Sequence, residues 1–232
     1  MPSGFAGLPA EGLAFFAALE RHNRREWFQP RKATFDDQVK QPMRELVVAI
    51  NGALQRFAPD YITDPDKAIY RIYRDTRFSA DKTPYKIHIA ASLPRRGIIS
   101  SAGFYFAVSH KEVAVGGGIY MPEKEMLASL RAHFAEHHAE FRKIIAARGL
   151  RQLYGDVQGE RLTRTPKGFP AGHPADDLLR LKQCYYYKTY PPEMATTPEL
   201  YTEIVKHLRA LTPFVEYLNV HLAGKRPRLS LE

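Results

Sequence analysis

The sequence predicts an α+β domain, in which a mostly antiparallel sheet is flanked by N-terminal, central and C-terminal helices. Three observations support this fold class. Apolar residues recur at helical spacing up to residue 57, alternate in several segments between residues 68 and 119, and return to helical spacing after Pro122. Helices at both ends of a run of strands are typical of α+β proteins.

The N-terminal region is expected to hold two or three helices. A first short helix is expected to end near His22. Asn23 stands three residues before Glu26, which is the spacing of a capping box, so we expect it to cap a second helix. Pro42 is expected to end or bend that helix, because proline lacks a backbone donor.

Two aromatic residues just inside the second helix, Trp27 and Phe28, are expected to anchor the N-terminal helices to the core. A further helical stripe follows Pro42. Its apolar members are Leu46, Val47, Ile50, Leu54 and Phe57.

The middle of the chain changes to a period of two. Residues 68–75 and 86–93 alternate as strands do, and the segments GFYFAVS and EVAVGGG flank His110 and Lys111 as the two strands of a hairpin would. A long amphipathic helix is expected after Pro122. A loop-rich section, a strand at QCYYYKTY and two short helices near residues 198–211 and 213–222 complete the prediction.

Length and composition favour one domain over residues 1–232, with Leu231 and Glu232 set aside as an expression-vector remnant. No apolar run approaches the ~18 to 20 residues that a membrane span needs, so no membrane association is expected. The N-terminus has no basic segment before an apolar block, so no secretory signal is expected. The single Cys184 cannot form an internal disulfide, which agrees with a cytoplasmic location.

The net charge of +9 favours anionic partners, nucleic acid among them. Much of the excess is local, since residues 71–96 contain seven basic and two acidic residues. The densest part is RIYRDTRFSADKTPYK, residues 71–86. Its cations are Arg71, Arg74, Arg77, Lys82 and Lys86, and its anions are Asp75 and Asp81.

Two aspartates cannot neutralise five cations, so the basic segment is a candidate anion site. The five cations would bind a phosphate or a carboxylate, and Asp75 and Asp81 would orient them. The alternative is an internal ion-pair lattice in which each aspartate holds one or two cations and fixes a turn. Distant glutamates would then supply the missing negative charge.

Other motifs carry weaker signals. HFAEH, residues 133–137, matches an inverted zincin pattern, but no third ligand follows, so we expect no metal and no cofactor. The glycines of GGGIYMP are expected to allow tight turning or close packing. Lys167 and His173 lie in a loop that would suit a lid over the site. Cys184 is expected to be structural, and the tyrosines that follow it to pack on the sheet.

Four segments resemble those of an uncharacterised family, domain of unknown function 2461. They are RIYRDTRFSADKTPYK, NRREWF near the N-terminus, GGGIYMP, and PKGF followed by GHP. The resemblance covers nearly the whole chain. It implies a single domain of shared architecture and carries over no catalytic residue.

The favoured interpretation is a protein that binds an anionic, phosphate-bearing ligand, such as a nucleotide, a phosphosugar or a nucleic acid, at the basic segment. A second interpretation is a metal-assisted phosphoester hydrolase that uses Asp75 or Asp81 with a divalent cation. Five neighbouring cations disfavour the binding of another one. A third interpretation is a structural or protein-interaction domain with an internal salt-bridge lattice. The sequence leaves all three open, and it leaves the oligomeric state open as well.

Overall fold

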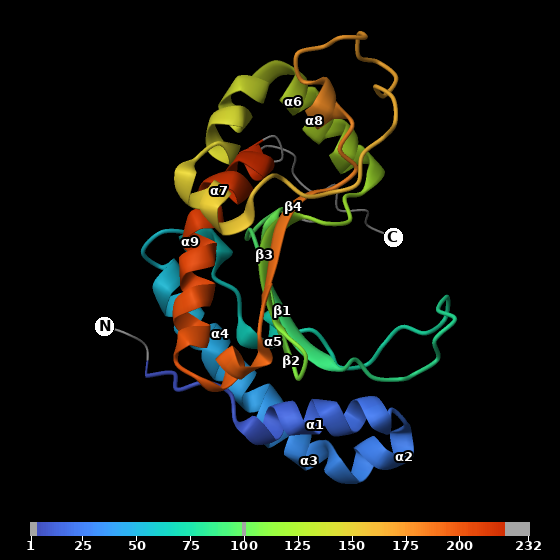
Figure 1. Cartoon of the computed structure of the whole chain (residues 1–232), viewed down its shortest axis with the longest axis vertical. Helices are drawn as coiled ribbons and strands as arrows, with labels where there is room; N and C mark the ends of the chain where they lie inside the picture. The colour runs from blue at the N-terminus through green and yellow to red at the C-terminus, as the bar shows by residue number, and fades with distance from the viewer. Residues whose placement is uncertain (1–3, 99–100, 221–232) are drawn as a thin grey trace. The chain divides into compact units, whose positions relative to one another are not determined.

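The structure of the protein, a computed structural model, describes residues 4–98 and 101–220 (Figure 1). It confirms the α+β class. One antiparallel sheet has the strand order β1-β2-β3-β4. Its strands are β1 (His88–Pro94), β2 (Gly103–Ser109), β3 (Val113–Ile119) and β4 (Cys184–Tyr190). The helices are α1 (Ala10–Arg21), α2 (Arg25–Phe28), α3 (Lys32–Phe35), α4 (Gln41–Leu54), α5 (Pro65–Ala68), α6 (Lys124–Ile145), α7 (Arg148–Tyr154), α8 (Asp176–Leu179) and α9 (Glu199–Val220).

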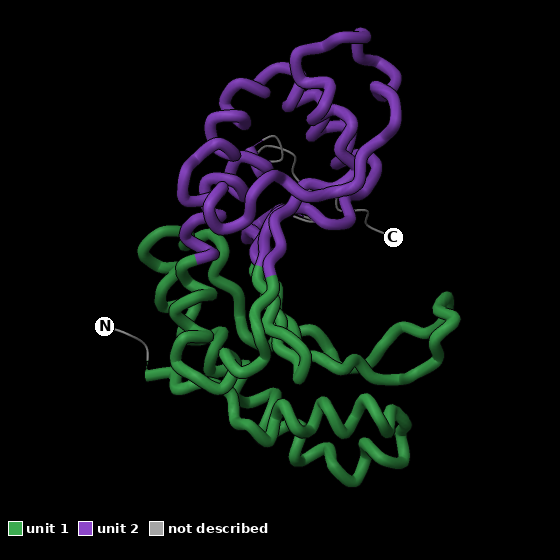
Figure 2. The backbone as a smooth tube through the Cα atoms, in the orientation of Figure 1, with its two compact units in different colours: residues 1–93, 105–115, 189–206 green, residues 94–104, 116–188, 207–232 purple. Residues whose placement is uncertain are grey.

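The chain divides into two compact units, coloured separately in Figure 2. Unit 1 comprises the residues up to 93 together with 105–115 and 189–206. Unit 2 comprises residues 94–104 and 116–188 and those from 207 onward. The single domain expected over residues 1–232 stays a prediction, and Leu231 and Glu232 lie outside the described residues.

The cap expected at Asn23 is wrong. The residue before α2 is Arg24, and no side chain caps this helix. The Asn23 side chain instead exchanges two hydrogen bonds with the backbone of Tyr85, 62 residues away in sequence. Asn23 therefore makes a long-range contact in place of a local helix cap. This contact satisfies the backbone amide and the backbone carbonyl of Tyr85, which would otherwise lack hydrogen-bond partners.

Pro42 does not end the N-terminal helical run. It lies in the first turn of α4, directly after a π-helical segment, Asp36–Lys40. An added Cβ on Gly12 of α1 would lie 2.5 Å from the carbonyl oxygen of Gln38, the group four residues before the proline. Proline cannot donate to that carbonyl, so the helix widens here and α1 packs closely against the widened turn.

Aromatic anchoring of the N-terminal helices falls mainly to Phe28. Phe28 is 1% exposed, and its ring stacks on Tyr85 with a centroid distance of 4.2 Å. Trp27 is only partly buried and packs between Phe15 and His22. Four members of the predicted stripe, Leu46, Val47, Ile50 and Leu54, are fully buried on α4. The fifth, Phe57, lies beyond the end of α4 and is only partly buried.

The predicted hairpin of β2 and β3 is confirmed, with a tight turn between Ser109 and Glu112. Residues 68–75, however, do not form a strand. They pair with residues 85–91 only through isolated antiparallel bridges, Ile69 with Ala91 and Tyr73 with Tyr85. The two bridges are not in one register, so an irregular stretch separates them.

The glycines of GGGIYMP serve close packing, as predicted. An added Cβ on Gly116 would lie 2.3 Å from the carbonyl oxygen of Tyr186, and one on Gly118 would lie 2.4 Å from that of Cys184. Gly118 also has a φ of +127°, a conformation that favours glycine. Both residues lie on β3 beside β4, so the glycines allow the two strands to pair closely.

The C-terminal part of the described chain forms one helix, α9, in place of the two that were predicted. Pro213 lies inside it. The residues around the proline, Leu211, Thr212, Phe214 and Val215, are buried. The Thr212 hydroxyl donates to the carbonyl oxygen of Leu208 at 2.8 Å. Burial of this face outweighs the helix-breaking tendency of one proline.

Within residues 4–98 and 101–220, every helix is too short or too polar to cross a lipid bilayer.

Cys184 is buried, and burial raises the pKa of its thiol. Of the three tyrosines that follow, Tyr186 is buried and Tyr187 is 38% exposed. The structural role predicted for Cys184 fits this environment, because a thiol with a raised pKa is a poor nucleophile.

Candidate functional site

The basic segment forms an arm, which we define as residues 70–86 of unit 1. At its base the backbone amide of Lys86 donates to the carbonyl oxygen of Ile72 at 2.8 Å, and that of Arg74 donates to Pro84 at 2.9 Å. Beyond these bonds the arm continues as a loop that extends away from the sheet (Figure 1). The basic arm therefore presents its charges on a projecting hairpin whose base is held by few backbone bonds.

Arg74 is the most enclosed arginine of the basic arm, with 26% of its side chain exposed. Its guanidinium contacts the carboxylate of Asp81 and the hydroxyl of Thr83, and it donates to the Thr83 carbonyl oxygen at 3.3 Å. The backbone amide of Thr83 donates to Asp81 at 2.9 Å. This amide and Arg74 lower the pKa of Asp81 to about 2, so its carboxylate is ionised at neutral pH.

Arg77 forms a second, separate pair with Asp75. Two guanidinium nitrogens donate to the Asp75 carboxylate at 3.0 and 2.8 Å, and the Arg77 backbone amide donates to it at 3.2 Å. This pairing lowers the pKa of Asp75. The Arg77 side chain is 77% exposed, so the pair stabilises the folded protein only weakly.

The two lysines of the basic arm bind backbone oxygens. Lys82 donates to the Thr76 carbonyl oxygen at 2.9 Å, and Lys86 donates to that of Arg71 at 3.0 Å. The Arg71 guanidinium forms no hydrogen bond or ion pair with another residue of the described chain. Of the five cations, only Arg74 and Arg77 therefore form the predicted ion pairs with aspartates. Each lysine ammonium donates one hydrogen bond to a backbone carbonyl oxygen.

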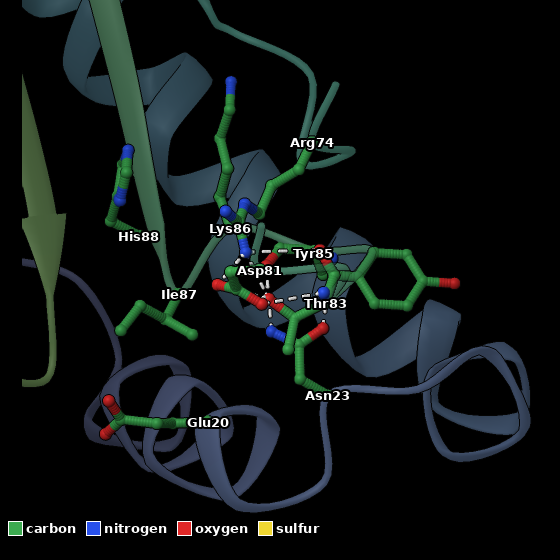
Figure 3. Close-up of a pocket in the computed structure, with 9 residues that line it drawn as sticks. All are labelled: Glu20, Asn23, Arg74, Asp81, Thr83, Tyr85, Lys86, Ile87 and His88. Carbon is green, nitrogen blue, oxygen red and sulfur yellow. Dashed lines mark hydrogen bonds and ion pairs between the residues drawn. The ribbon is translucent and has the colours of Figure 1, made fainter. Parts of the chain in front are cut away.

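A pocket of about 350 Å³ lies against the base of the basic arm (Figure 3). All of its lining residues belong to unit 1. They are Glu20, Asn23, Arg74, Asp81, Thr83, Tyr85, Lys86, Ile87 and His88. Of the five predicted cations, the pocket thus brings together Arg74 and Lys86, and it adds His88. Arg71, Arg77 and Lys82 do not line it, nor does Asp75.

The negative charge of the pocket wall is already engaged by the protein. Glu20 pairs with Lys111 at 2.5 Å and with Nε2 of His110 at 2.9 Å, both from the turn between β2 and β3. The hydrogen bond from Lys111 is the main cause of the lowered pKa of Glu20. Asp81, the other acidic residue of the wall, is bound by Arg74 and by the Thr83 amide.

Lys86 and His88 differ from these acidic residues, because no group of opposite charge among the described residues is paired with them. Burial lowers the pKa of Lys86, and Arg71 lowers it further. Burial also lowers the pKa of His88, with Lys86 as the second cause. Within the described chain, neither residue forms an ion pair with a carboxylate. In Figure 3 the Arg74 guanidinium points toward Asp81, whereas the Lys86 ammonium points away from it. The pocket therefore has two positively charged or protonatable groups that lack a negative partner.

Sequence reasoning missed Glu20, Asn23 and His88. A signal for His88 was present, because the alternation predicted over residues 86–93 places it two residues after Lys86 on the same face. In the structure β1 begins only at His88. Glu20 and Asn23 lie more than 50 residues before Arg74 in sequence, and no local pattern connects them to it.

The proposed lid residues remain untested. Lys167 and His173 belong to unit 2, whereas the pocket belongs to unit 1. His173 accepts a hydrogen bond at Nδ1 from the Ala175 amide at 3.0 Å, and its ring lies 6.2 Å from that of His138. These contacts hold His173 within its own unit, and a role as a lid stays a prediction.

The HFAEH segment lies on α6, where the rings of His133 and His137 are 4.7 Å apart. The helix is kinked at His137, and the Tyr217 hydroxyl donates to the carbonyl oxygen of that residue at 3.0 Å. Among the described residues, no group of three His, Cys, Asp or Glu side chains is placed to hold a metal ion. That no metal is needed stays a prediction.

Comparison with known protein families confirms the resemblance to domain of unknown function 2461. Residues 11–217 match the model of the family described as conserved hypothetical protein (DUF2461). The chain belongs to this family. No curated protein and no solved structure matches the chain. Because the DUF2461 description records no activity, the chemistry of the pocket has to be argued from its residues.

Proposed function

We propose that this DUF2461 protein binds a small oxyanion, a phosphate group in the first place, in the pocket at the base of the basic arm. The observation that carries the proposal is the pair of neighbouring groups, Lys86 and His88, that lack a carboxylate partner while burial disfavours their charged forms. An anion would relieve that electrostatic penalty. An ammonium has three N–H donors, and Lys86 uses one on Arg71.

Arg74 supports the same proposal as the third basic group of the wall. Its contacts with Asp81 and Thr83 hold the guanidinium in one orientation, which lowers the entropy lost on binding a ligand. The size of the pocket suits a small phosphate-bearing molecule, because ligand sites typically measure roughly 300 to 1,000 Å³. The lone, buried Cys184 is compatible with a cytoplasmic setting, which is part of the proposal.

A hydrolase that uses both aspartates receives less support. Asp75 does not line the pocket, and each aspartate is bound by its own arginine. A purely structural lattice accounts for Arg77 with Asp75. It does not account for Lys86 and His88, which have no anionic partner in the described chain.

The test is a thermal-shift titration with inorganic phosphate against chloride at matched ionic strength. We expect phosphate to raise the melting temperature of the wild type in proportion to the logarithm of its concentration above the dissociation constant. Lys86→Met keeps the apolar stem and removes the charge, so it should abolish the specific part of the shift. Arg77→Ala, outside the pocket, should retain it.

General salting-out by phosphate acts on every variant alike. The comparison between Lys86→Met and Arg77→Ala therefore isolates binding at the pocket. Equal shifts in wild type, Lys86→Met and Arg74→Ala would contradict the proposal.

A further inference from the structure

Three aromatic side chains of the basic arm are exposed, although exposure of large apolar rings is unfavourable. Tyr70 is 47% exposed, Tyr73 is 43% exposed and Phe78 is 96% exposed. Single exposed aromatics are ordinary on protein surfaces. Three within nine consecutive residues of one projecting hairpin indicate a surface that a partner covers.

The exposed rings alternate with cations. Arg71 lies between Tyr70 and Tyr73, and Arg77 precedes Phe78 directly. The Arg77 guanidinium lies 5.8 Å from the centre of the Phe78 ring, and its position is fixed by the two hydrogen bonds to Asp75. At the other end of the basic arm, the Lys86 ammonium lies 5.3 Å from the centre of the Tyr70 ring.

We infer that the ligand of the pocket is a phosphate group of a single-stranded nucleic acid, whose neighbouring bases stack on Tyr70, Tyr73 and Phe78. Proteins that bind single strands without sequence preference combine a basic track for the phosphates with exposed aromatic rings for the bases. The basic arm has both features along one hairpin. This inference rests on the proposed function, since it identifies the molecule that carries the phosphate.

Other occupants fit the basic arm less well. A lipid surface favours contiguous apolar side chains, whereas here each ring is separated from the next by charged or polar residues, and two of the three carry hydroxyls. An acidic peptide would satisfy the cations and leave the exposed ring of Phe78 unexplained. Duplex nucleic acid would engage the cations, but its bases are already stacked and do not offer faces to the rings.

Fluorescence anisotropy with a labelled oligothymidylate of about 12 nucleotides tests the inference at low salt. Replacement of Phe78 by alanine should weaken binding by about tenfold, the typical effect of losing one stacked base. Tyr73→Ala should act similarly. Tyr120→Ala is the matched control, because Tyr120 is 61% exposed and lies on unit 2, outside the basic arm.

Inorganic phosphate binding is measured on the same variants, so that failure of the inference and failure of the proposed function are distinguishable. Phe78→Ala should bind inorganic phosphate as wild type does, whereas Lys86→Met should lose both ligands. Phosphate binding without oligothymidylate binding would overturn the inference and leave the proposed function standing.

Three further results would also overturn it. They are equal affinity of Phe78→Ala and Tyr120→Ala for the oligothymidylate, equal affinity of wild type for single-stranded and duplex DNA, and Phe78-dependent binding to phosphatidylserine vesicles with none to the oligothymidylate. The last of these would assign the basic arm to a membrane surface.

Discussion

The side-chain amide of Asn23 pairs with the backbone of Tyr85 as a neighbouring strand would. It donates to the Tyr85 carbonyl oxygen at 2.8 Å and accepts from the Tyr85 amide at 3.0 Å. The Tyr85 ring is buried on Phe28 at the same point. This pair fixes the chain beside Lys86, so the segment between α1 and α2 positions one wall of the pocket.

Asn23→Ala should therefore lower stability and phosphate affinity together. Leaving a buried backbone donor and acceptor unsatisfied typically costs about 1 to 3 kcal/mol. Urea denaturation measures the first effect and a phosphate titration the second. Asn51→Ala is the matched control, because Asn51 makes the same two-bond pair with Thr63, at 2.7 and 3.3 Å, away from the pocket lining. An equal loss of phosphate affinity in both variants would show that Asn23 has no positioning role.

Phe28, rather than Trp27, should dominate the anchoring of the N-terminal helices. Phe28→Ala should cost about 3 to 5 kcal/mol, because it removes a fully buried ring from the contact with Tyr85. Trp27→Ala should cost clearly less, since that ring is partly exposed between His22 and Arg31. Urea denaturation followed by circular dichroism gives both values. A larger effect from Trp27→Ala would contradict this ranking.

The sequence was sufficient for the fold class and for most elements, because their patterns are periodic. The alternation in GFYFAVS and the stripe of α4 each bury one face, and a periodic pattern reports that burial directly. The predictions that were wrong depend on tertiary packing, which a local sequence pattern does not report. Asn23 makes a tertiary contact in place of a cap, and Pro213 is tolerated because its neighbours are buried. Residues 68–75 alternate without a continuous partner strand.

The pocket could be predicted only in part. Charge density identified Arg74 and Lys86, and the same density also included Arg71, Arg77 and Lys82, which do not line the pocket. Side-chain direction on a projecting hairpin is decided by turn geometry, and composition does not encode it. The carboxylate that binds Lys111 and His110 belongs to Glu20, some 90 residues earlier in the chain. No local sequence pattern connects residues that far apart.

Gly116→Ala should destabilise the sheet by more than about 1 kcal/mol, because the new methyl group would lie 2.3 Å from the Tyr186 carbonyl oxygen on β4. Gly52→Ala provides the control. Gly52 lies within α4 with nothing within 4 Å of an added Cβ, so alanine should stabilise by roughly 0.5 to 1 kcal/mol. Thermal denaturation of the two variants should move in opposite directions. A neutral Gly116→Ala would show that β3 and β4 can separate without loss.

Asp81→Asn should flatten the acid limb of the stability profile. The pKa of Asp81 is lowered to about 2 in the folded protein, below the ordinary value of about 3.9 for an aspartate. The folded state therefore favours the ionised carboxylate, and this stabilisation is complete above the ordinary value and is lost as the pH falls toward 2. Between these values the melting temperature of wild type should fall more steeply than that of Asp81→Asn.

The same variant tests the role of Asp81 at neutral pH. Removing its charge leaves Arg74 without a competing anion, so Asp81→Asn should bind inorganic phosphate more tightly than wild type does. Weaker binding would show that the orientation which Asp81 imposes on Arg74 matters more for phosphate binding than its competition for the guanidinium. Asp75→Asn serves as the control and should leave phosphate affinity unchanged, because Asp75 does not line the pocket.

His88 should report directly on anion binding through its pKa. Burial and the charge of Lys86 lower that pKa below the ordinary value of about 6.5. The unfolded state therefore binds more protons in this range, and the contribution of His88 to stability falls as the pH decreases through the ordinary value. Removing one of the two causes should reverse part of the shift. In Lys86→Met, an NMR titration of the His88 ring should give a higher pKa than in wild type.

An anion in the pocket should raise the pKa of His88 as well, because it stabilises the protonated ring. Sulfate is the suitable probe, since its charge does not change over this range of pH. By linkage, sulfate affinity should increase as the pH falls, because His88 then gains its proton. The other charged groups of the wall, Arg74, Asp81 and Glu20, keep their charges over this range of pH. His88→Gln should remove this pH dependence while Lys86 and Arg74 retain a basal affinity. A sulfate-insensitive pKa of His88, with binding still intact, would place the anion on the Arg74 side of the pocket, out of contact with β1.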